Sequence, residues 1–213
     1  MRTNPPKRYD RVKRFADVVV AFIALVVSSP FQLVIAVLVA VKLGRPVLFK
    51  QPRPGLNGET FTLYKFRSMT NVNLTRGLVA DADRLTPFGR ALRSSSLDEL
   101  PTLVNVLRGD MSLIGPRPLL VAYLDRYTPE QARRHEVRPG VTGLAQASGR
   151  NALSWDDKFD LDVYYVDHRS FLLDLNIIAK TLRSVVKREG ISAADSVTMP
   201  EFRGTDRAET ADD

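Results

Sequence analysis

The chain has 213 residues, 44% of them apolar and 26% charged, which allows one ordinary domain and a short appendage. Its formal net charge of +7 favours an anionic partner: nucleic acid, anionic lipid or a phosphorylated substrate. The absence of cysteine excludes disulfides and cysteine-ligated metals, and agrees with a cytosolic catalytic face.

The first feature along the chain is a stretch of 24 residues without a charge, residues 18–41. As a helix it would be about 36 Å long, enough to cross a hydrocarbon core of about 30 Å. A cleaved signal peptide is disfavoured because the stretch is too long and no A-x-A-like site follows it. A buried core helix is disfavoured because a domain of this size rarely buries so long an uncharged run. We therefore expect a membrane segment.

Basic residues flank this segment on both sides, with six Lys or Arg in residues 1–14 and four in residues 42–58. Since Lys and Arg prefer the cytoplasmic side, a simple spanning helix would place one flank on the unfavoured side. A helix that enters and leaves on one face satisfies both flanks. Ser29 and Pro30 predict the break, because proline removes a backbone donor and serine hydroxyls can bond to the freed carbonyl. A proline-kinked spanning helix remains the alternative.

Beyond this segment the pattern predicts an α+β fold, mostly helical, with a small β-hairpin. Residues 46–50 and 59–67 are β-prone, and Asn57-Gly58 between them is a strong turn signal. We expect helices over residues 86–93, 96–108, 119–127, 129–136, 154–168 and 172–189, with a loop at 71–83. The expected parts are a basic N-terminus with the re-entrant membrane helix (1–44), a cytoplasmic catalytic domain (45–203) and a disordered tail (204–213).

The last expected helix is amphipathic. Leu175, Ile178, Leu182 and Val185 share one face, and basic residues fill the other. This pattern is typical of an interfacial helix on a membrane, and packing against the core explains it equally well.

Two adjacent acids, Asp98 and Glu99, are the main candidates for chemistry. Ser96 followed by Glu99 is also a capping-box pattern, so a purely structural role is the alternative. Arginines at turns or near this segment suit phosphate oxygens, because the guanidinium fork matches them; the candidates are Arg67, Arg93, Arg117 and Arg150. Together these residues predict a site for a metal-bound diphosphate, in which a carboxylate can attack phosphorus.

Other chemistries fit poorly. His135 and His168 have no partner at metal-ligand spacing, and the sequence has no G-x-S-x-G, Walker A or dinucleotide glycine motif.

Seven short motifs occur in a fixed order: FKQPRPG (49–55), YKFRSM (64–69), SLDELP (96–101), GDMS (109–112), GPRP (115–118), RPGVTGLAQ (138–146) and GRN (149–151). Through them the chain resembles the bacterial sugar transferase family, and within it the small monotopic phosphoglycosyl transferases of the PglC type. The resemblance covers residues 7–204.

The resemblance implies transfer of a sugar 1-phosphate from a UDP-sugar to polyprenyl (undecaprenyl) phosphate, with release of UMP. This is the first membrane step of glycoconjugate or exopolysaccharide assembly, with membrane lipids and downstream glycosyltransferases as further partners. It implies a location in the cytoplasmic (inner) membrane, with the catalytic domain on the cytoplasmic face.

The resemblance also implies roles for individual residues. Asp98 is the nucleophile that forms a covalent phosphosugar intermediate, and Glu99 assists with metal binding or proton transfer. Both would hold Mg²⁺, the family's cofactor. Arg93, Arg117 and Arg150 are implied to bind phosphate and Asp162 to be a further active-site acid, while Ser29-Pro30 matches the break in the re-entrant helix.

Two other functions are compatible with parts of the pattern. One is a non-catalytic adaptor on the membrane surface, in which Asp98 and Glu99 only cap a helix. The other is a membrane-tethered nucleic-acid binder, which is disfavoured because no aromatic stacking motif accompanies the basic residues; we expect no nucleic-acid partner.

Overall fold

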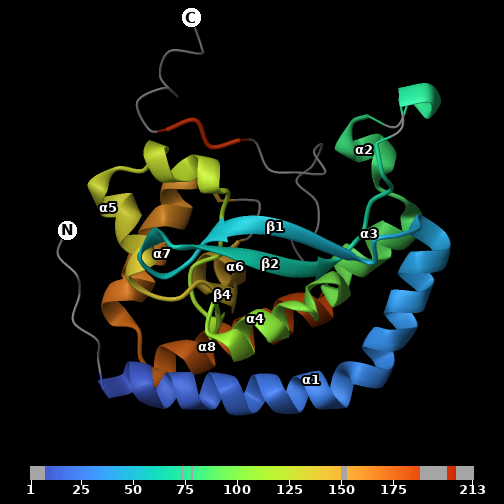
Figure 1. Cartoon of the computed structure of the whole chain (residues 1–213). Coiled ribbons are helices and arrows are strands. Elements are labelled where there is room, and N and C mark those ends of the chain that lie inside the picture. Colours follow the sequence, from blue (N-terminus) through green and yellow to red (C-terminus); the bar gives the residue numbers. More distant parts are fainter. Residues whose placement is uncertain (1–7, 73, 78, 150–152, 188–200, 205–213) are drawn as a thin grey trace, which may run out of the picture.

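The computed structural model describes residues 8–72, 74–77, 79–149, 153–187 and 201–204. Helices dominate these residues, and the two sheets found among them have two strands each (Figure 1). In chain order the elements are α1 (Arg8–Leu43), β1 (Leu48–Pro54), η1 (Leu56–Gly58), β2 (Thr60–Phe66), η2 (Leu74–Arg76), α2 (Asp81–Arg84), α3 (Pro87–Ser94), η3 (Leu97–Glu99), α4 (Thr102–Arg108), β3 (Ser112–Ile114), η4 (Val121–Arg126), α5 (Pro129–Ala132), η5 (Arg133–Glu136), β4 (Gly140–Thr142), α6 (Leu144–Ser148), α7 (Trp155–His168) and α8 (Phe171–Lys187). The expected mostly helical α+β class is confirmed.

α1 is a 36-residue helix that bends partway along its length (Figure 1). Pro30 lies inside it and has no N–H to donate to the carbonyl of Val26, one turn earlier. The Ser29 hydroxyl donates to that carbonyl at 2.8 Å, and Ser28 donates to the carbonyl of Ala24 at 2.5 Å. The serine hydroxyls thus satisfy backbone carbonyls at the proline, as the sequence predicts.

By length and composition, α1 is long and apolar enough to cross a membrane. Only 11% of its most apolar 18-residue window is buried in the protein, and side chains such as Phe15, Val27 and Leu33 are exposed. It is therefore not a core helix, and it is suited to anchor the protein in a membrane.

The few buried residues of α1 attach it to the domain on both sides of Pro30. Before the proline, Ala21 packs in a cluster with β2 and α4. After it, Ile35, Val39 and Leu43 pack with Phe66 of β2 and with α3. Residues four apart share one helix face, so this spacing gives the second half its own buried stripe. The bend lets both halves follow the surface of the domain (Figure 1).

β1 and β2 form the expected antiparallel hairpin, with Leu48 opposite Phe66 and Pro54 opposite Thr60. Asn57 and Gly58 adopt left-handed conformations (φ 56° and 80°) at the turn, which these two residue types tolerate. β1 extends four residues beyond the predicted strand, from Lys50 to Pro54. Its prolines are tolerated because β1 is an edge strand.

One predicted helix is divided. Residues 96–108 contain the short η3 and then α4, with Pro101 preceding α4. Pro101 cannot donate the backbone hydrogen bond that a helix continuing from η3 would require. Gly109 is left-handed (φ 93°) and ends α4 as predicted.

The second sheet was not predicted. β3 and β4 pair in parallel, with Ser112 opposite Gly140, and each strand has only three residues. Such short strands give too little alternation to detect in a sequence.

The other expectations have mixed outcomes. Helical segments over 129–136 and 154–168 are confirmed as α5–η5 and α7. The expected loop at 71–83 contains η2 and the start of α2. Where an α-helix was expected at 119–127, the structure has the 3₁₀ helix η4, Val121–Arg126. α6 was missed. Of the expected tail, residues 205–213 lie outside the described residues.

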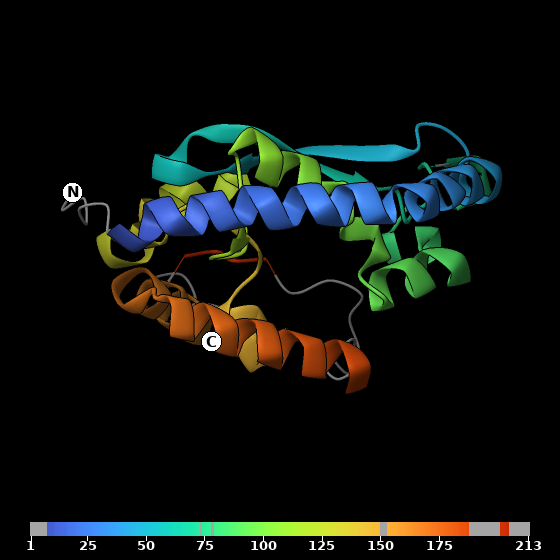
Figure 2. The same cartoon turned by 90° about the horizontal axis from the view of Figure 1, so that it is seen from below.

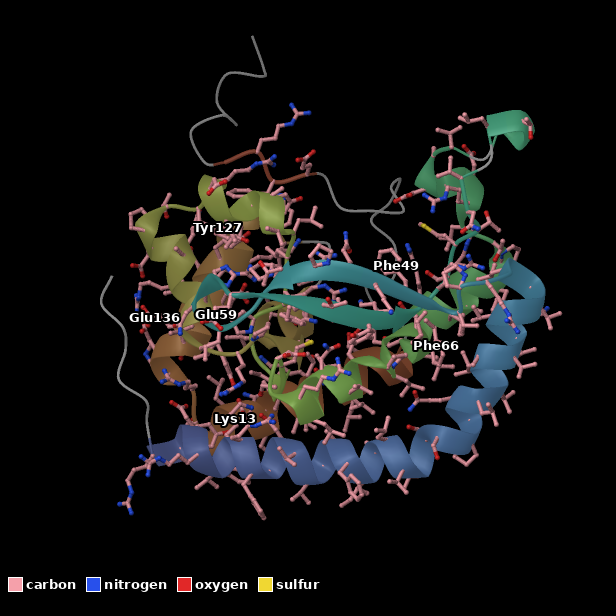
Figure 3. All side chains as sticks on the ribbon, viewed as in Figure 1. Lys13, Phe49, Glu59, Phe66, Tyr127 and Glu136 are labelled. Carbon is pink, nitrogen blue, oxygen red and sulfur yellow. The ribbon has the colours of Figure 1, made fainter. Side chains whose placement is uncertain are left out.

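α1 and α8 lie across the same face of the domain (Figure 2). Asp174 of α8 accepts hydrogen bonds from Tyr9 at 2.6 Å and from Lys13, labelled in Figure 3, at 2.8 Å. Leu175 and Leu182 of α8 are more than half exposed, and core packing therefore does not explain the predicted stripe. The two helices present exposed apolar side chains on one side of the molecule.

Candidate active site

The acidic pair lies in a tight connection between α3 and α4. α3 begins as predicted, with the Thr86 hydroxyl accepting from the Gly89 amide at 3.1 Å. After α3, Ser96 turns left-handed (φ 56°), and η3 then carries Asp98 and Glu99. The Ser96 side chain makes no capping hydrogen bond, so the capping-box interpretation is wrong. The acids need another explanation.

Glu99 is held by two cations from elsewhere in the chain. Its Oε1 accepts from Lys65 Nζ of β2 at 2.5 Å and from Arg117 Nη2 of the GPRP turn at 3.2 Å. Burial alone would raise the pKa of Glu99, but the charges and hydrogen bonds of Arg117 and Lys65 outweigh it and lower the pKa to about 2. Glu99 is therefore ionised at neutral pH and fixed in position.

Asp98 has the opposite surroundings. It is 8% exposed, and no residue in the described part of the chain donates a hydrogen bond to its carboxylate. Burial, and then the negative charge of Glu99, raise the pKa of Asp98 to about 6, although Lys65, Arg93 and Arg117 oppose the shift. Asp98 thus has free lone pairs and unusual basicity, which are the properties of a nucleophilic carboxylate.

Asn105 fixes the strand that carries Lys65 against the helix that follows Glu99. Its amide nitrogen donates to the carbonyl of Thr62 at 2.7 Å and to Asp110 at 3.0 Å, while its oxygen accepts from the Tyr64 amide at 3.1 Å. Asn105 is fully buried in α4. These bonds fix the register of β2 against α4 and so the approach of Lys65 to Glu99.

Two of the four predicted phosphate-binding arginines lie at the acidic pair. Arg93, at the end of α3, donates to the Ser68 hydroxyl at 2.9 Å and acts electrostatically on Asp98. The side chain of Arg117 is 47% exposed, so its guanidinium can also reach a bound anion. Arg150 lies outside the described residues.

Arg67 lies at the end of α1, and its role in phosphate binding stays a prediction. Its terminal nitrogens donate to the backbone carbonyls of Leu43, Gly44 and Arg45, and to Asn71 at 2.8 Å. Because the last carbonyls of a helix lack intrahelical donors, this guanidinium caps the end of α1. It connects α1 to β2.

Asp162 lies beneath the site. It pairs with Arg134 (Oδ2 to Nη2, 2.6 Å), and both side chains are almost fully buried. The same Nη2 donates to the backbone carbonyl of Arg117 at 2.7 Å. The Arg134 guanidinium packs against the rings of Phe159 and of Tyr127; Figure 3 labels Tyr127. Asp162 therefore supports Arg117 through Arg134, and its implied role as a further active-site acid stays a prediction.

Lys65 is the site residue that the sequence analysis missed. Residues 61, 63 and 65 of a strand share one face, and Phe61 and Leu63 pack in the core. A lysine that continues such an apolar series predicts a buried ion pair. That signal was present within the YKFRSM motif. Arg134 gave no comparable signal.

The described residues contain no group of three or more His, Asp or Glu side chains arranged to hold a metal ion. Asp98 and the Glu99 Oε2 are the available donors. Mg²⁺ in phosphoryl-transfer sites commonly takes one or two carboxylates and completes its shell with substrate phosphates and water. The donor set therefore fits an Mg²⁺ ion that binds together with a phosphorylated substrate.

Similar proteins point to one family. The chain is 53% identical over 195 residues to the uncharacterized sugar transferase EpsL of Bacillus subtilis, covering 91% of this chain and 96% of that protein. It is 41% identical over 191 residues to the UDP-N-acetylgalactosamine-undecaprenyl-phosphate N-acetylgalactosaminephosphotransferase of Aeromonas hydrophila, covering 85% of this chain and 45% of that protein. It is 38% identical over 194 residues to the UDP-glucose:undecaprenyl-phosphate glucose-1-phosphate transferase of Caulobacter vibrioides, covering 85% of this chain and 72% of that protein. The chain thus spans less than half of the Aeromonas protein.

Residues 8–188 match the bacterial sugar transferase family, a range that contains α1, the acidic pair and every arginine discussed above. With this match and these identities, the chain belongs to the bacterial sugar transferase family.

Proposed function

We propose that this protein transfers a sugar 1-phosphate from a UDP-sugar to undecaprenyl phosphate or a similar polyprenyl phosphate, releasing UMP. The observation that carries the proposal is the contrast between Asp98 and Glu99, adjacent acids whose surroundings move their pKa values in opposite directions. The names of the Aeromonas and Caulobacter relatives support the two substrate classes.

In the proposed first step, an Asp98 oxygen attacks the phosphorus that carries the sugar. The bond from that phosphorus to the bridging oxygen breaks, and its electron pair leaves with UMP. In the second step an oxygen of the lipid phosphate attacks the same phosphorus, and the aspartyl bond breaks to restore the carboxylate. Glu99 remains ionised throughout and keeps Lys65 and Arg117 in place.

Arg93, Arg117 and Arg150 are the residues we assign to the substrate phosphates. Asp98 and Glu99 would hold Mg²⁺, which when bound would supply charge neutralisation on the diphosphate. Asp98 keeps its basicity because burial disfavours its charged form, while at pH 7 most of it is ionised.

We also propose that residues 1–44 enter the cytoplasmic (inner) membrane and return to the same face, leaving residues 45–203 as a catalytic domain in the cytoplasm. Both flanks of α1 are basic, the helix is bent (Figure 1), and Pro30 inside it lacks a backbone donor. α8, which lies across the same face (Figure 2), adds exposed leucines. This placement brings the lipid phosphate and the soluble nucleotide sugar to one surface.

The test uses the purified full chain with Mg²⁺, polyprenyl phosphate and a panel of UDP-sugars, with UMP release as the readout. Asp98→Asn should reduce release by about a thousandfold or more, as expected for loss of a nucleophile. Asp160→Asn, an exposed acid of α7, is the matched control and should retain activity. Mass spectrometry should find a phosphosugar on the peptide containing Asp98.

Undiminished turnover by Asp98→Asn would show that Asp98 is not the nucleophile. Absence of UMP release with every UDP-sugar would favour the non-catalytic adaptor.

A further inference from the structure

Arg53 of β1 is a half-buried cation that none of the contacts above explains. Its Nη2 donates to Gln51 Oε1 at 2.6 Å. Its Nε is buried without a hydrogen-bond partner, and within the described ranges no carboxylate forms an ion pair with it. A guanidinium partly removed from water, with a buried N–H that has no acceptor and no counter-ion, is unfavourable, so its position here favours the binding of an anion.

Arg117 and Lys158, which come from two other elements, share this environment. β1 packs against η4, which follows the turn that carries Arg117. Burial, and then the positive charge of Arg117, lower the pKa of Arg53 to about 10. Burial and the same Arg117 charge lower the pKa of Lys158, whose ammonium lies 5.2 Å from the centre of the Trp155 ring. Arg117 of the GPRP turn thus acts on both Arg53 of β1 and Lys158 of α7.

This group differs from the set of cations that acts on Asp98. The cations whose charges act on the pKa of Asp98 are Lys65, Arg93 and Arg117, and Arg53 is not among them. Arg117 is the common neighbour of both groups. A diphosphate bound along Arg117 would therefore place one phosphate at Asp98 and the other at Arg53.

We propose that Arg53 and Lys158, together with Arg117, form a subsite for the phosphate that Asp98 does not attack, the nucleotide phosphate that leaves as UMP. This inference rests on the proposed transferase function and assigns the leaving group a position within that site.

The chemistry explains why cations belong there. When the bridging P–O bond breaks, its electron pair stays on the oxygen of the nucleotide, whose phosphate gains one negative charge. Fixed cations bind that phosphate more strongly after the bond breaks than before, which lowers the barrier. The lipid phosphate that attacks in the second step occupies the same subsite, because it approaches the same phosphorus along the path by which UMP left.

The test measures UMP binding to the full-length protein in detergent by isothermal titration calorimetry, without turnover. Arg53→Gln should weaken UMP binding by about tenfold or more, the usual effect of losing a hydrogen bond to a charged group. The UMP affinity of Arg53→Lys should lie between those of the wild type and Arg53→Gln, because lysine keeps the positive charge but lacks the planar guanidinium fork. The control Arg108→Gln removes an exposed arginine that contacts the ring of Tyr64, and should bind UMP like the wild type.

Lys158→Gln is the second variant, and it should weaken UMP binding by severalfold even if Arg53→Gln fails to fold. Wild-type UMP affinity in a folded Arg53→Gln or Lys158→Gln would overturn the proposal. An equal loss in Arg108→Gln would also overturn it, because the effect would then follow net charge alone. If UMP binding depends on Arg53 while no transferase activity is found, then the proposed function has failed and the subsite has not.

Discussion

Lys65 donates a 2.5 Å hydrogen bond to Glu99, joining the open end of the hairpin to the turn that carries the acidic pair. The two residues are 34 positions apart, and the bond depends on the hairpin and α4 packing together. Because Glu99 also binds Arg117, this one carboxylate fixes the position of both cations relative to Asp98.

This relationship predicts strong coupling between Lys65 and Glu99. Lys65→Met leaves Glu99 partly unpaired in a buried place, and should destabilise the protein by about 1–3 kcal/mol while lowering activity strongly. In the double variant Lys65→Met/Glu99→Gln the losses should be less than additive, by about 1 kcal/mol or more. The free energies of unfolding in detergent of the wild type, Lys65→Met, Glu99→Gln and the double variant measure this coupling. Additive losses of stability would contradict it.

The pKa of Asp98 predicts how activity depends on pH. Because the attacking form is the carboxylate and its pKa is about 6, kcat/KM should fall as the pH decreases through 6. The charge of Glu99 contributes to raising that pKa, so Glu99→Gln should move the acidic limb to lower pH. A limb at the same pH in Glu99→Gln would show that another group titrates.

The same shift predicts a gain in stability when the charge is removed. The pKa of Asp98 is higher in the folded protein than its ordinary value of 3.8, so its ionisation opposes folding at neutral pH. Asp98→Asn should therefore be more stable than the wild type at pH 7, by about 1–3 kcal/mol. The advantage should shrink as the pH falls from 6 to about 4, where the wild-type carboxyl is protonated too. Thermal melts across this range measure it; lower stability of Asp98→Asn at pH 7 would contradict the burial argument.

The Arg134–Asp162 pair predicts a supporting role that can be separated from catalysis. Asp162→Asn leaves a buried guanidinium without its counter-ion and should cost about 3–5 kcal/mol of stability. Arg134→Met/Asp162→Leu should recover much of that loss, since apolar residues replace both charges. In any of these variants that retains transferase activity, the acidic limb of the pH profile of kcat/KM should keep its position. A shifted limb would support a role of Asp162 as an active-site acid.

The bend in α1 predicts the sidedness of its two ends. The chain has no cysteine, so single cysteines placed at residues 12 and 45 can be labelled selectively in intact spheroplasts and after lysis. A re-entrant helix should leave both sites protected until lysis. Pro30→Ala restores the backbone donor to Val26 and should increase the fraction that spans the bilayer. Labelling of one end in intact spheroplasts of the wild type would establish the kinked spanning helix.

Local signals in the sequence were enough to predict several elements. Asn57-Gly58 predicted the hairpin because few residue pairs accept two left-handed conformations in succession. Thr86-Pro87 predicted the start of α3, since the cap and the proline act within one turn. Ser29 and Pro30 predicted the missing backbone donor within α1 and the hydroxyl that bonds to the carbonyl of Val26 in its place. Each of these depends on residues only a few positions apart.

The sequence by itself also identified Asp98 and Glu99, but it could not distinguish a helix cap from a reaction centre. The tertiary structure decided against the cap, because Ser96 is left-handed and its side chain makes no capping hydrogen bond. It also decided what surrounds the two acids, since β2 and the GPRP turn bring cations to Glu99, whereas no described residue donates a hydrogen bond to the Asp98 carboxylate. It likewise gave Arg67 to the end of α1 and Asp162 to Arg134. Residue types determine which groups can ionise or donate; only packing between distant segments determines which of them meet, and that sets the pKa and the role of each.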